Sequence, residues 1–259
     1  MDIDTSKPNA GRIYDYLLGG HHNFEADRNA AEFLRQQVPQ LPKWMRLNRW
    51  FLGHAVDGLV AGGFNHYIDL ATGLPTQGYL HERVPATTRI IYNDIDPTTV
   101  AYAEQMLVGR TNIRYVQSDI RSPEQVLRQA DAFFGGERHV GICMVGVAYF
   151  IDDAALKHTL RQLYDWAAPG SRLAVSFITV NGAFPVDAPV MEIYQKMGSA
   201  IYPRTQAEIA DVMQLWRPIA PGLRALASYI EEETGIAVQI PQLPSGEAMM
   251  GGIFEKPAA

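Results

Sequence analysis

Three aspartates stand where short apolar runs of the sequence end. Asp69 closes the run that begins at Tyr67, Asp94 follows the run 90–92, and Asp119 comes shortly after the run 113–116. A carboxylate accepts hydrogen bonds from an ammonium group, a vicinal diol or an exocyclic amine. In an open α/β sheet, the ligand crevice lies outside the carboxyl ends of the strands. We therefore expect the three carboxylates to bind separate parts of one ligand.

The turn after Asp69 is made of small residues and reads Ala71-Thr72-Gly73-Leu74-Pro75. Such a turn lets the backbone approach a ligand, and a helix after it would offer free N–H groups. It departs from G-x-G-x-x-G at Ala71 and at Pro75, and Pro75 has no N–H group for a pyrophosphate. These departures disfavour a dinucleotide and suit S-adenosylmethionine, whose tail is an amino acid. We predict that Asp69 binds the ammonium group of this tail; the alternative is that Asp69 only caps the loop.

The second aspartate has the spacing of a ribose-binding acid. Asp94 follows Gly73 by 21 residues, close to the ~20 residues that separate a glycine turn from such an acid. Asp96 competes for this role, but Pro97 makes it the cap of a helix. We expect Asp94 to bind the ribose, with Ile95 and Asp96 beside the cofactor.

The third aspartate, Asp119, is expected to accept from the adenine amino group. Ser118 and Ile120 flank it, and Ile120 would cover one face of the ring. The alternative is an ordinary loop aspartate ahead of the capping box that begins at Ser122.

The elements that position these residues alternate between short apolar runs and amphipathic stretches. The runs are 67–71, 89–93, 113–117, 139–147 and 172–179, with two further strands expected at 223–230 and 249–254. Buried runs separated by helices predict an α/β fold: a Rossmann-like, mostly parallel seven-stranded sheet with helices on both faces. Residues 1–62 are expected to form an N-terminal helical cap of the same domain, with helices at 27–37 and 43–60, and residues 63–259 its core.

The fourth run leads into a segment that could hold a methyl acceptor. Gly146 and Val147 would lie beside the cofactor, and Tyr149 and Phe150 would line the acceptor pocket, unless the two aromatic rings are plain core. Among the histidines, His81 is the candidate for a general base, and the alternative is a surface or core role. His21-His22 lacks a spaced carboxylate partner, so no metal is expected.

Composition limits the partners. A net charge of −6 argues against broad nucleic-acid binding. The single cysteine, Cys143, allows no intramolecular disulfide. The N-terminus does not resemble a signal peptide, and the longest apolar stretch, about 140–151, is too short to span a bilayer. We expect a soluble cytoplasmic protein with no membrane partner and an undetermined oligomeric state.

The run from Phe64 to about Thr179 resembles class I S-adenosylmethionine-dependent methyltransferases. The opening Gly11 to Gly20, which contains Y-D-Y-L-L-G-G, is similar to that of methyltransferase family 19, as are Asn23-Phe24 and Asp27-Arg28. That family has a D-x-G-T-G-L-P-T loop, matched here from Asp69 to Thr76 except that Ala71 replaces glycine. The resemblance implies a cofactor-binding methyltransferase fold and supplies no acceptor.

The N-terminal segment is expected to fold over the cofactor and exclude water. Tyr14, Tyr16, Gly20 and Asn23 would contact the cofactor and Phe24 the acceptor, since the aromatic residues offer flat apolar surface with polar tips. The alternative is an extra helix packed on the sheet.

These features predict an S-adenosylmethionine-dependent methyltransferase acting on a small molecule by in-line transfer. A non-catalytic S-adenosylmethionine-binding regulatory or partner-binding protein and a nicotinamide-dependent oxidoreductase stay open as alternatives. Transfer of an aminopropyl group is a third, less favoured because acids near Tyr149 begin only at Asp152.

Overall fold

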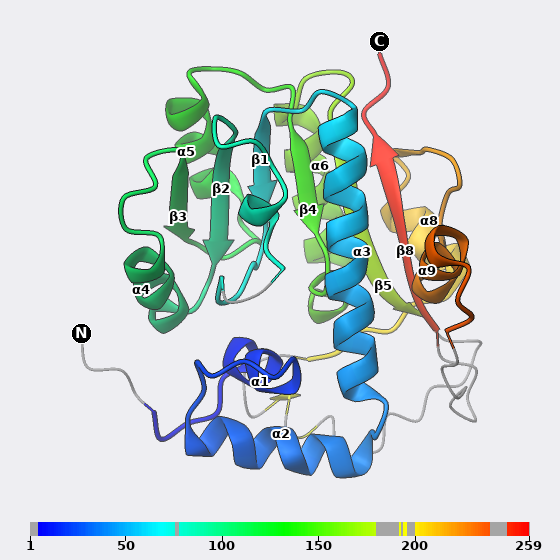
Figure 1. The fold of residues 1–259 in the computed structure, drawn as a ribbon. Coiled ribbons are helices and arrows are strands. Elements are labelled where there is room, and N and C mark those ends of the chain that lie inside the picture. Colours follow the sequence, from blue (N-terminus) through cyan, green and yellow to red (C-terminus); the bar gives the residue numbers. More distant parts are fainter. Residues whose placement is uncertain are drawn as a thin grey trace.

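The computed structural model describes residues 5–75, 78–179, 192, 194–195, 200–238 and 248–258. Its centre is one mixed sheet whose strands follow the order β3-β2-β1-β4-β5-β8-β6, with β7 paired to β8 off this path (Figure 1). The strands are β1 His66–Asp69, β2 Arg89–Asp94, β3 Ile113–Gln117, β4 Gly141–Met144, β5 Arg172–Thr179, β6 Arg217–Pro218, β7 Arg224–Ala225 and β8 Ala248–Glu255. The pairs among β1 to β5 are parallel and those with β8 antiparallel, which confirms the predicted mostly parallel sheet.

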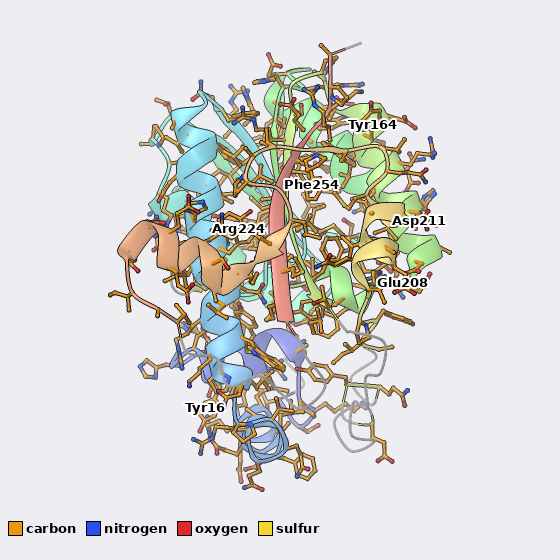
Figure 2. The ribbon with its side chains drawn as sticks, turned by 90° about the vertical axis from the view of Figure 1, so that its right-hand side faces the viewer. Tyr16, Tyr164, Glu208, Asp211, Arg224 and Phe254 are labelled. Atoms are coloured by element: carbon orange, nitrogen blue, oxygen red, sulfur yellow. The ribbon has the colours of Figure 1, made fainter. Side chains whose placement is uncertain are left out.

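Helices cover both faces of this sheet, as Figure 2 shows edge-on. One face packs against α5 Glu124–Phe134, α6 Asp153–Trp166 and α8 Gln206–Val212, and the other against α3 Leu41–Ala61, α4 Pro97–Met106 and α9 Leu226–Thr234. Neighbouring residues of a strand alternate between the two cores: Ile91 joins the first, while Ile90 and Tyr92 join the second. Such two-sided burial explains the continuous apolar runs of the sequence.

The first two helices, α1 Ala10–Leu17 and α2 Glu25–Gln37, lie across the edge of the sheet at which the parallel strands end (Figure 1). The predicted helices at 27–37 and 43–60 match α2 and α3. The long helix α3 packs its buried face directly on the sheet. None of the described helices is long and apolar enough to cross a membrane.

Three local predictions were wrong. The run 223–230 is a strand only at β7 and continues as α9, because Leu226 and Tyr229 stand at helical spacing and pack on α3. Ser122 makes no capping box, since Pro123 occupies the cap of α5 and Gln125 donates to the Gln117 carbonyl. In the described residues between β1 and β2, the expected α-helix is absent and there is one short 3-10 turn, η1 Leu80–Glu82.

The glycine pair in the last strand has a packing reason. A side chain at Gly251 would stand 2.5 Å from Leu226 and 2.9 Å from Phe51, so only glycine lets α3 and α9 close over β8. The predicted strand 249–254 is therefore confirmed within β8 despite its glycines.

Candidate functional site

The carboxyl ends of β1, β2, β3 and β4 meet at one edge of the sheet. Asp69 pairs in register with Tyr92 on β2 and with Cys143 on β4, and Asp94 pairs with Gln117 on β3. Asp69 and Asp94 therefore end neighbouring strands on the same side, and Asp119 follows two residues after the end of β3. The topology brings the three predicted acids to one edge.

The loop after Asp69, residues 70–75 and called here the Gly73 loop, is held by residues of β2 and β3 and by Tyr79, which directly precedes η1. The Ala71 and Thr72 N–H groups donate to the side chain and backbone oxygens of Asn93, at 3.3 and 2.8 Å. The Tyr79 hydroxyl donates to the Thr72 carbonyl at 3.1 Å, and the Tyr115 hydroxyl to the Gly73 carbonyl at 2.7 Å. Leu74, in the same loop, is buried. The loop is thus fixed by the protein itself.

Backbone conformation in this loop explains part of its composition. Gly73 has φ +72°, a left-handed conformation that glycine adopts freely, and Ala71 has φ +52°. Ala71 stands where the resembled family has glycine, so it adopts a backbone conformation that disfavours any Cβ.

Asn93 ties three strand ends together. Its side-chain oxygen accepts from the loop after β1, while its Nδ2 donates to Ser118 O and Oγ, each at 2.8 Å, and to Val116 O at 3.2 Å. The side chain is fully buried. Asn93 therefore sets the spacing between the Gly73 loop and the loop that carries Asp119.

Asp94 faces the Gly73 loop. Its Oδ2 accepts from the Gly73 N–H and its Oδ1 from the Asp96 N–H, both at 3.0 Å. Burial raises the pKa of Asp94 to about 6, against the opposing effect of these two N–H groups. The next residue, Ile95, is an apolar side chain left 54% exposed beside this carboxylate.

Asp96 caps α4, as predicted. Its side chain accepts from the Thr98 and Thr99 N–H groups and also from the Asn9 side chain, at 3.1 Å. The cap of α4 is therefore also an anchor for the N-terminal segment.

Asp69 is buried within the end of β1, with 4% of its surface exposed. Burial raises its pKa to about 7, and the nearby Asp94 charge acts in the same direction, whereas Arg49 opposes the shift. Arg49 comes from α3 and stacks its guanidinium over Tyr79, 4.4 Å from the ring centroid. The edge thus carries one buried carboxylate with a cation nearby.

Asp119 lies in a different electrostatic setting. Arg121 binds it at 2.6 Å and holds the pKa of this carboxyl below its ordinary value. Ser118 and Ile120, on either side, are buried; Ile120 belongs to the core below α5 and α6. An adenine amino group would have to share the Asp119 carboxylate with Arg121.

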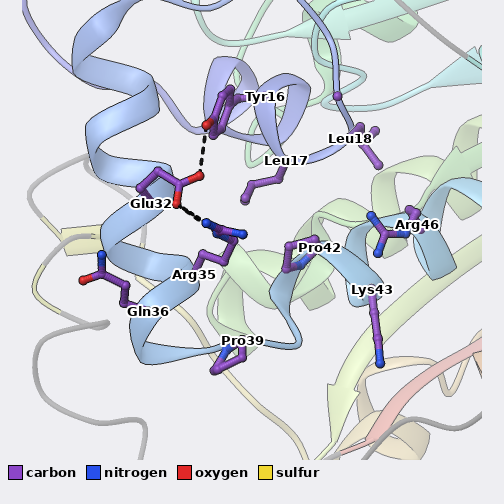
Figure 3. Close-up of a pocket in the computed structure, with 11 residues that line it drawn as sticks. Tyr16, Leu17, Leu18, Glu32, Arg35, Gln36, Pro39, Pro42, Lys43 and Arg46 are labelled. Carbon is purple, nitrogen blue, oxygen red and sulfur yellow. Dashed lines mark hydrogen bonds and ion pairs between the residues drawn. The ribbon is translucent and has the colours of Figure 1, made fainter.

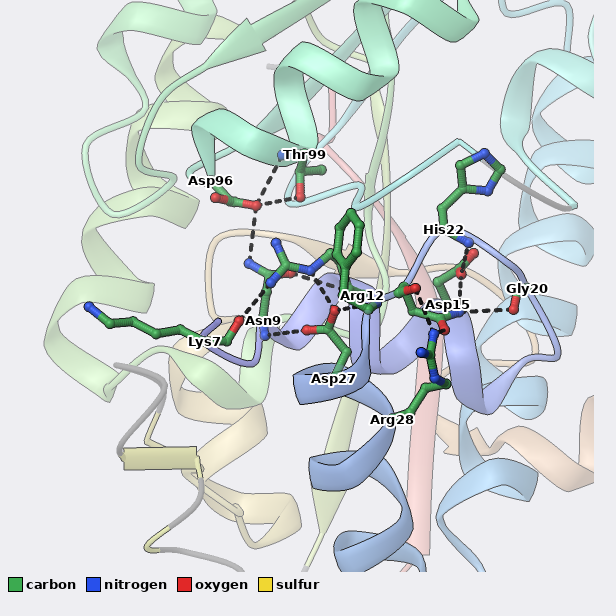
Figure 4. A network of polar contacts seen from close by, with 12 residues as sticks. Lys7, Asn9, Arg12, Asp15, Gly20, His22, Asp27, Arg28, Asp96 and Thr99 are labelled. Carbon is green, nitrogen blue, oxygen red and sulfur yellow. Dashed lines mark hydrogen bonds and ion pairs between the residues drawn. The ribbon is translucent and has the colours of Figure 1, made fainter. Parts of the chain in front are cut away.

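Helix α1 lies directly on the Gly73 loop. The position of a Cβ on Gly11 would be 3.9 Å from the Gly73 Cα atom, so the two backbones approach closely. A buried ion pair between Arg12 and Asp27, 2.7 Å long, joins α1 to α2. Figure 4 shows this pair together with the Asn9 link to Asp96.

The predicted N-terminal contacts divide between the two sides of α1. Tyr14 is half-buried and lies near Arg49, whose guanidinium is 5.6 Å from its ring centroid, and its hydroxyl donates to the Met45 carbonyl. Tyr16 instead donates to Glu32 on α2 and lines a cavity of about 710 Å³ bordered by α1, α2 and α3 (Figure 3). Tyr14 therefore faces the strand ends, and Tyr16 faces this separate cavity.

The turn between α1 and α2 is organised by Asp15. Asn23 donates to the Asp15 carboxylate at 3.0 Å, and any side chain on Gly20 would collide with it. Phe24 lies against the Arg12 guanidinium, 5.4 Å from its ring centroid. In the described structure these three predicted contact residues shape the turn and its attachment to α2.

The end of β4 carries a buried polar network. Gly146 has φ +82°, and its N–H donates to Ser176 Oγ, which donates to Asn48 Oδ1, each at 2.8 Å. Asn48 Nδ2 reaches the Tyr149 hydroxyl only at 3.5 Å. This leaves a buried amide and a buried phenol with weak partners where an acceptor is expected.

Aromatic rings surround that network. Tyr149 is 7% exposed and Phe150 is half-buried, with ring centroids 4.7 Å apart, and Tyr194 lies 5.5 Å from Phe150. Val147 is buried in the core beneath them. The region is aromatic and largely buried.

His81 lies beneath the Gly73 loop in a cluster of tyrosines. Its Nδ1 is 2.8 Å from the Tyr92 hydroxyl, which also accepts from the His81 N–H. Nδ1 and the Tyr92 hydroxyl are thus within hydrogen-bond distance, and which of them donates depends on the tautomer of His81. Burial lowers the pKa of His81, so the imidazole is neutral near pH 7.

Sequence reasoning missed Arg49, Asn93, Tyr79, Tyr115 and Asn48. Each reaches the edge from an element whose packing the sequence does not reveal; a polar residue within an apolar run is the only signal, and only Asn93 has it. Among the described residues, no group of three possible ligands could hold a metal ion.

The sequence matches the family described as S-adenosyl methyltransferase over residues 1–256. The chain belongs to this family. The cofactor of this methyltransferase is therefore S-adenosylmethionine, which favours it over the nicotinamide alternative. A comparison with curated proteins gave no match.

Solved structures agree with this assignment. A candidate methyltransferase from Thermobifida fusca YX is 29% identical, with a TM-score of 0.86 over 98% of this methyltransferase and 97% of that chain. A DUF574 family protein from Streptomyces avermitilis MA-4680 is 27% identical, with a TM-score of 0.81; the match covers 99% of this methyltransferase and 100% of that chain. The fold is shared with the 1,6-didemethyltoxoflavin-N1-methyltransferase of Burkholderia thailandensis, which is 14% identical with a TM-score of 0.52. That match covers 100% of this methyltransferase and 94% of the other chain.

Proposed function

We propose that this methyltransferase binds S-adenosylmethionine at the carboxyl edge of β1 to β4, beneath α1, and methylates a small molecule. The observation that carries the proposal is the meeting of Asp69 and Asp94 with the fixed Gly73 loop under that helix. When bound, S-adenosylmethionine supplies an electrophilic methyl group on a sulfonium.

The residues of the edge suit the parts of this cofactor. Asp69 would accept from the ammonium group and Asp94 from the ribose hydroxyls. The exposed Ile95 side chain would be covered by the adenine, with Asp119 near its amino group. Ala71, Thr72 and Gly73 would approach through their backbone, and Gly146 would leave space beside them.

A small acceptor is supported by the surroundings of the β4 end. Tyr149 and Tyr194 are buried, Phe150 and Tyr14 are half-buried, and α1 and α3 lie over the same edge. Largely buried aromatic surroundings suit a metabolite better than a protein or nucleic acid strand. In-line transfer needs chiefly alignment of acceptor and methyl group, which such walls provide. His81 is the weak candidate for a base, and its Nδ1 is already engaged by Tyr92.

The cofactor site is tested by calorimetric titration with S-adenosylhomocysteine and with NAD. Wild type should bind the first and not the second, and Asp94→Ala should weaken binding about tenfold or more, since it removes a charged acceptor. Asp211→Ala is the matched control: its exposed carboxylate pairs with Lys157 between α8 and α6 (Figure 2 labels Asp211). Binding of NAD alone would refute the site.

The acceptor class is tested with cofactor labelled in its methyl group. A cell extract is split by ultrafiltration into metabolites and macromolecules, and each fraction is incubated with enzyme. We expect label in the metabolite fraction with wild type and Asp211→Ala, and much less with Asp94→Ala. Label confined to protein or RNA would refute a small acceptor.

A further inference from the structure

Arg49 is a half-buried cation that forms no ion pair with any of the described carboxylates. Its guanidinium rests between the rings of Tyr79 and Tyr14, 4.4 and 5.6 Å from their centroids, and its Nε is buried without a hydrogen-bond partner. A guanidinium removed from water is costly unless an anion and hydrogen bonds compensate it. Arg49 is therefore placed to bind an anion.

Asp69 is the nearest candidate, and the two groups do influence each other. Arg49 lowers the pKa of Asp69, and Asp69 contributes to a raised pKa of Arg49. They nevertheless make no direct ion pair, because β1 fixes the carboxylate while Tyr14 and Tyr79 fix the guanidinium. One anion and one cation thus stand near each other, each with capacity left for a ligand.

This arrangement complements a zwitterion. We propose that Arg49 binds the α-carboxylate of the methionyl tail of S-adenosylmethionine while Asp69 binds its ammonium group. The inference rests on the proposed function and adds a specificity-determining residue to it. Arg49 selects ligands that carry the carboxylate, and Tyr14 couples this selection to the docking of α1. A guanidinium suits a carboxylate because its planar N–H groups match two oxygens.

The test is a thermodynamic cycle in which the carboxylate is removed from the ligand and the guanidinium from the protein, separately and together. Calorimetry compares S-adenosylhomocysteine with its decarboxylated analogue, which keeps the adenosine and the ammonium group, in wild type and in Arg49→Gln. In wild type the analogue should bind about 10- to 100-fold more weakly, as expected for a charged hydrogen-bonded pair. In Arg49→Gln the full ligand should weaken by a similar factor and the analogue should not, so the two affinities become nearly equal.

A purely structural role would give a different result. If Arg49→Gln weakens both ligands equally, the assignment is refuted. Arg161→Gln, which removes an exposed arginine of α6, is the matched control and should leave both affinities unchanged. If Arg49→Gln does not fold, the wild-type comparison still decides: equal affinities for the two ligands refute the role of Arg49, whereas binding of neither refutes the proposed cofactor site.

Discussion

Burial sets the pKa values of the two aspartates at the carboxyl ends of β1 and β2. Asp69 and Asp94 end neighbouring strands, and burial raises the pKa of each carboxyl. Between the ordinary value of 3.8 and their raised pKa values, the folded chain holds protons that the unfolded chain has released. The contribution of these two groups to stability is therefore greatest at low pH and is lost as pH rises through about 6 to 7.

Cofactor binding should show the opposite dependence on pH. An ammonium group and ribose hydroxyls favour the ionised carboxylates, so affinity for S-adenosylhomocysteine should rise about tenfold from pH 5.5 to 7.5. Calorimetric titration across this range measures it, and Asp69→Asn should flatten most of the rise. An affinity that falls with pH in wild type would contradict this account.

Ala71 holds a left-handed conformation at a cost that glycine avoids. Ala71→Gly should raise the free energy of unfolding by about 1 kcal/mol, measured by urea denaturation. Ala101→Gly, within α4, is the matched control and should lower it by about 0.5–1 kcal/mol, because glycine there only adds freedom to the unfolded chain. Equal destabilisation by both changes would show that Ala71 is not strained.

Helix α1 and the Gly73 loop pack directly against each other. The loop is held from below by Asn93, Tyr79 and Tyr115, and α1 lies above it through Gly11 and Asn9. A ligand between them would make contacts with both, and its binding energy would oppose local opening of α1.

Hydrogen exchange tests this coupling. S-adenosylhomocysteine at 100 times its Kd stabilises the bound state by about 2.7 kcal/mol, so amides of residues 10–17 should exchange far more slowly. Residues 206–212 of α8, on the far face of the sheet, serve as the internal reference and should not change. Protection confined to the strand-end loops would show that α1 does not cover the ligand.

Local patterns along the chain were sufficient to predict the succession of the parallel strands and the edge of the sheet that carries the acids. The parallel runs, the cap at Asp96 and the positions of Asp69 and Asp94 follow from short-range signals. Arg49, Tyr79 and Tyr115 could not be predicted, because their roles depend on contacts across 20 to 42 residues of sequence. The run 223–230 was misassigned because a short apolar stretch suits a strand or a helix until its packing partner is known.

The hydrogen bonds that fix the Gly73 loop have a kinetic consequence. Because the protein's own hydrogen bonds already hold this loop, we expect it to rearrange little when the ligand arrives. We expect the slow event to be the opening of α1, because the Gly11 backbone lies against Gly73. The observed rate of ligand binding would then rise with ligand concentration only until it reaches the rate at which α1 opens. The same opening rate would limit the release of S-adenosylhomocysteine after methyl transfer.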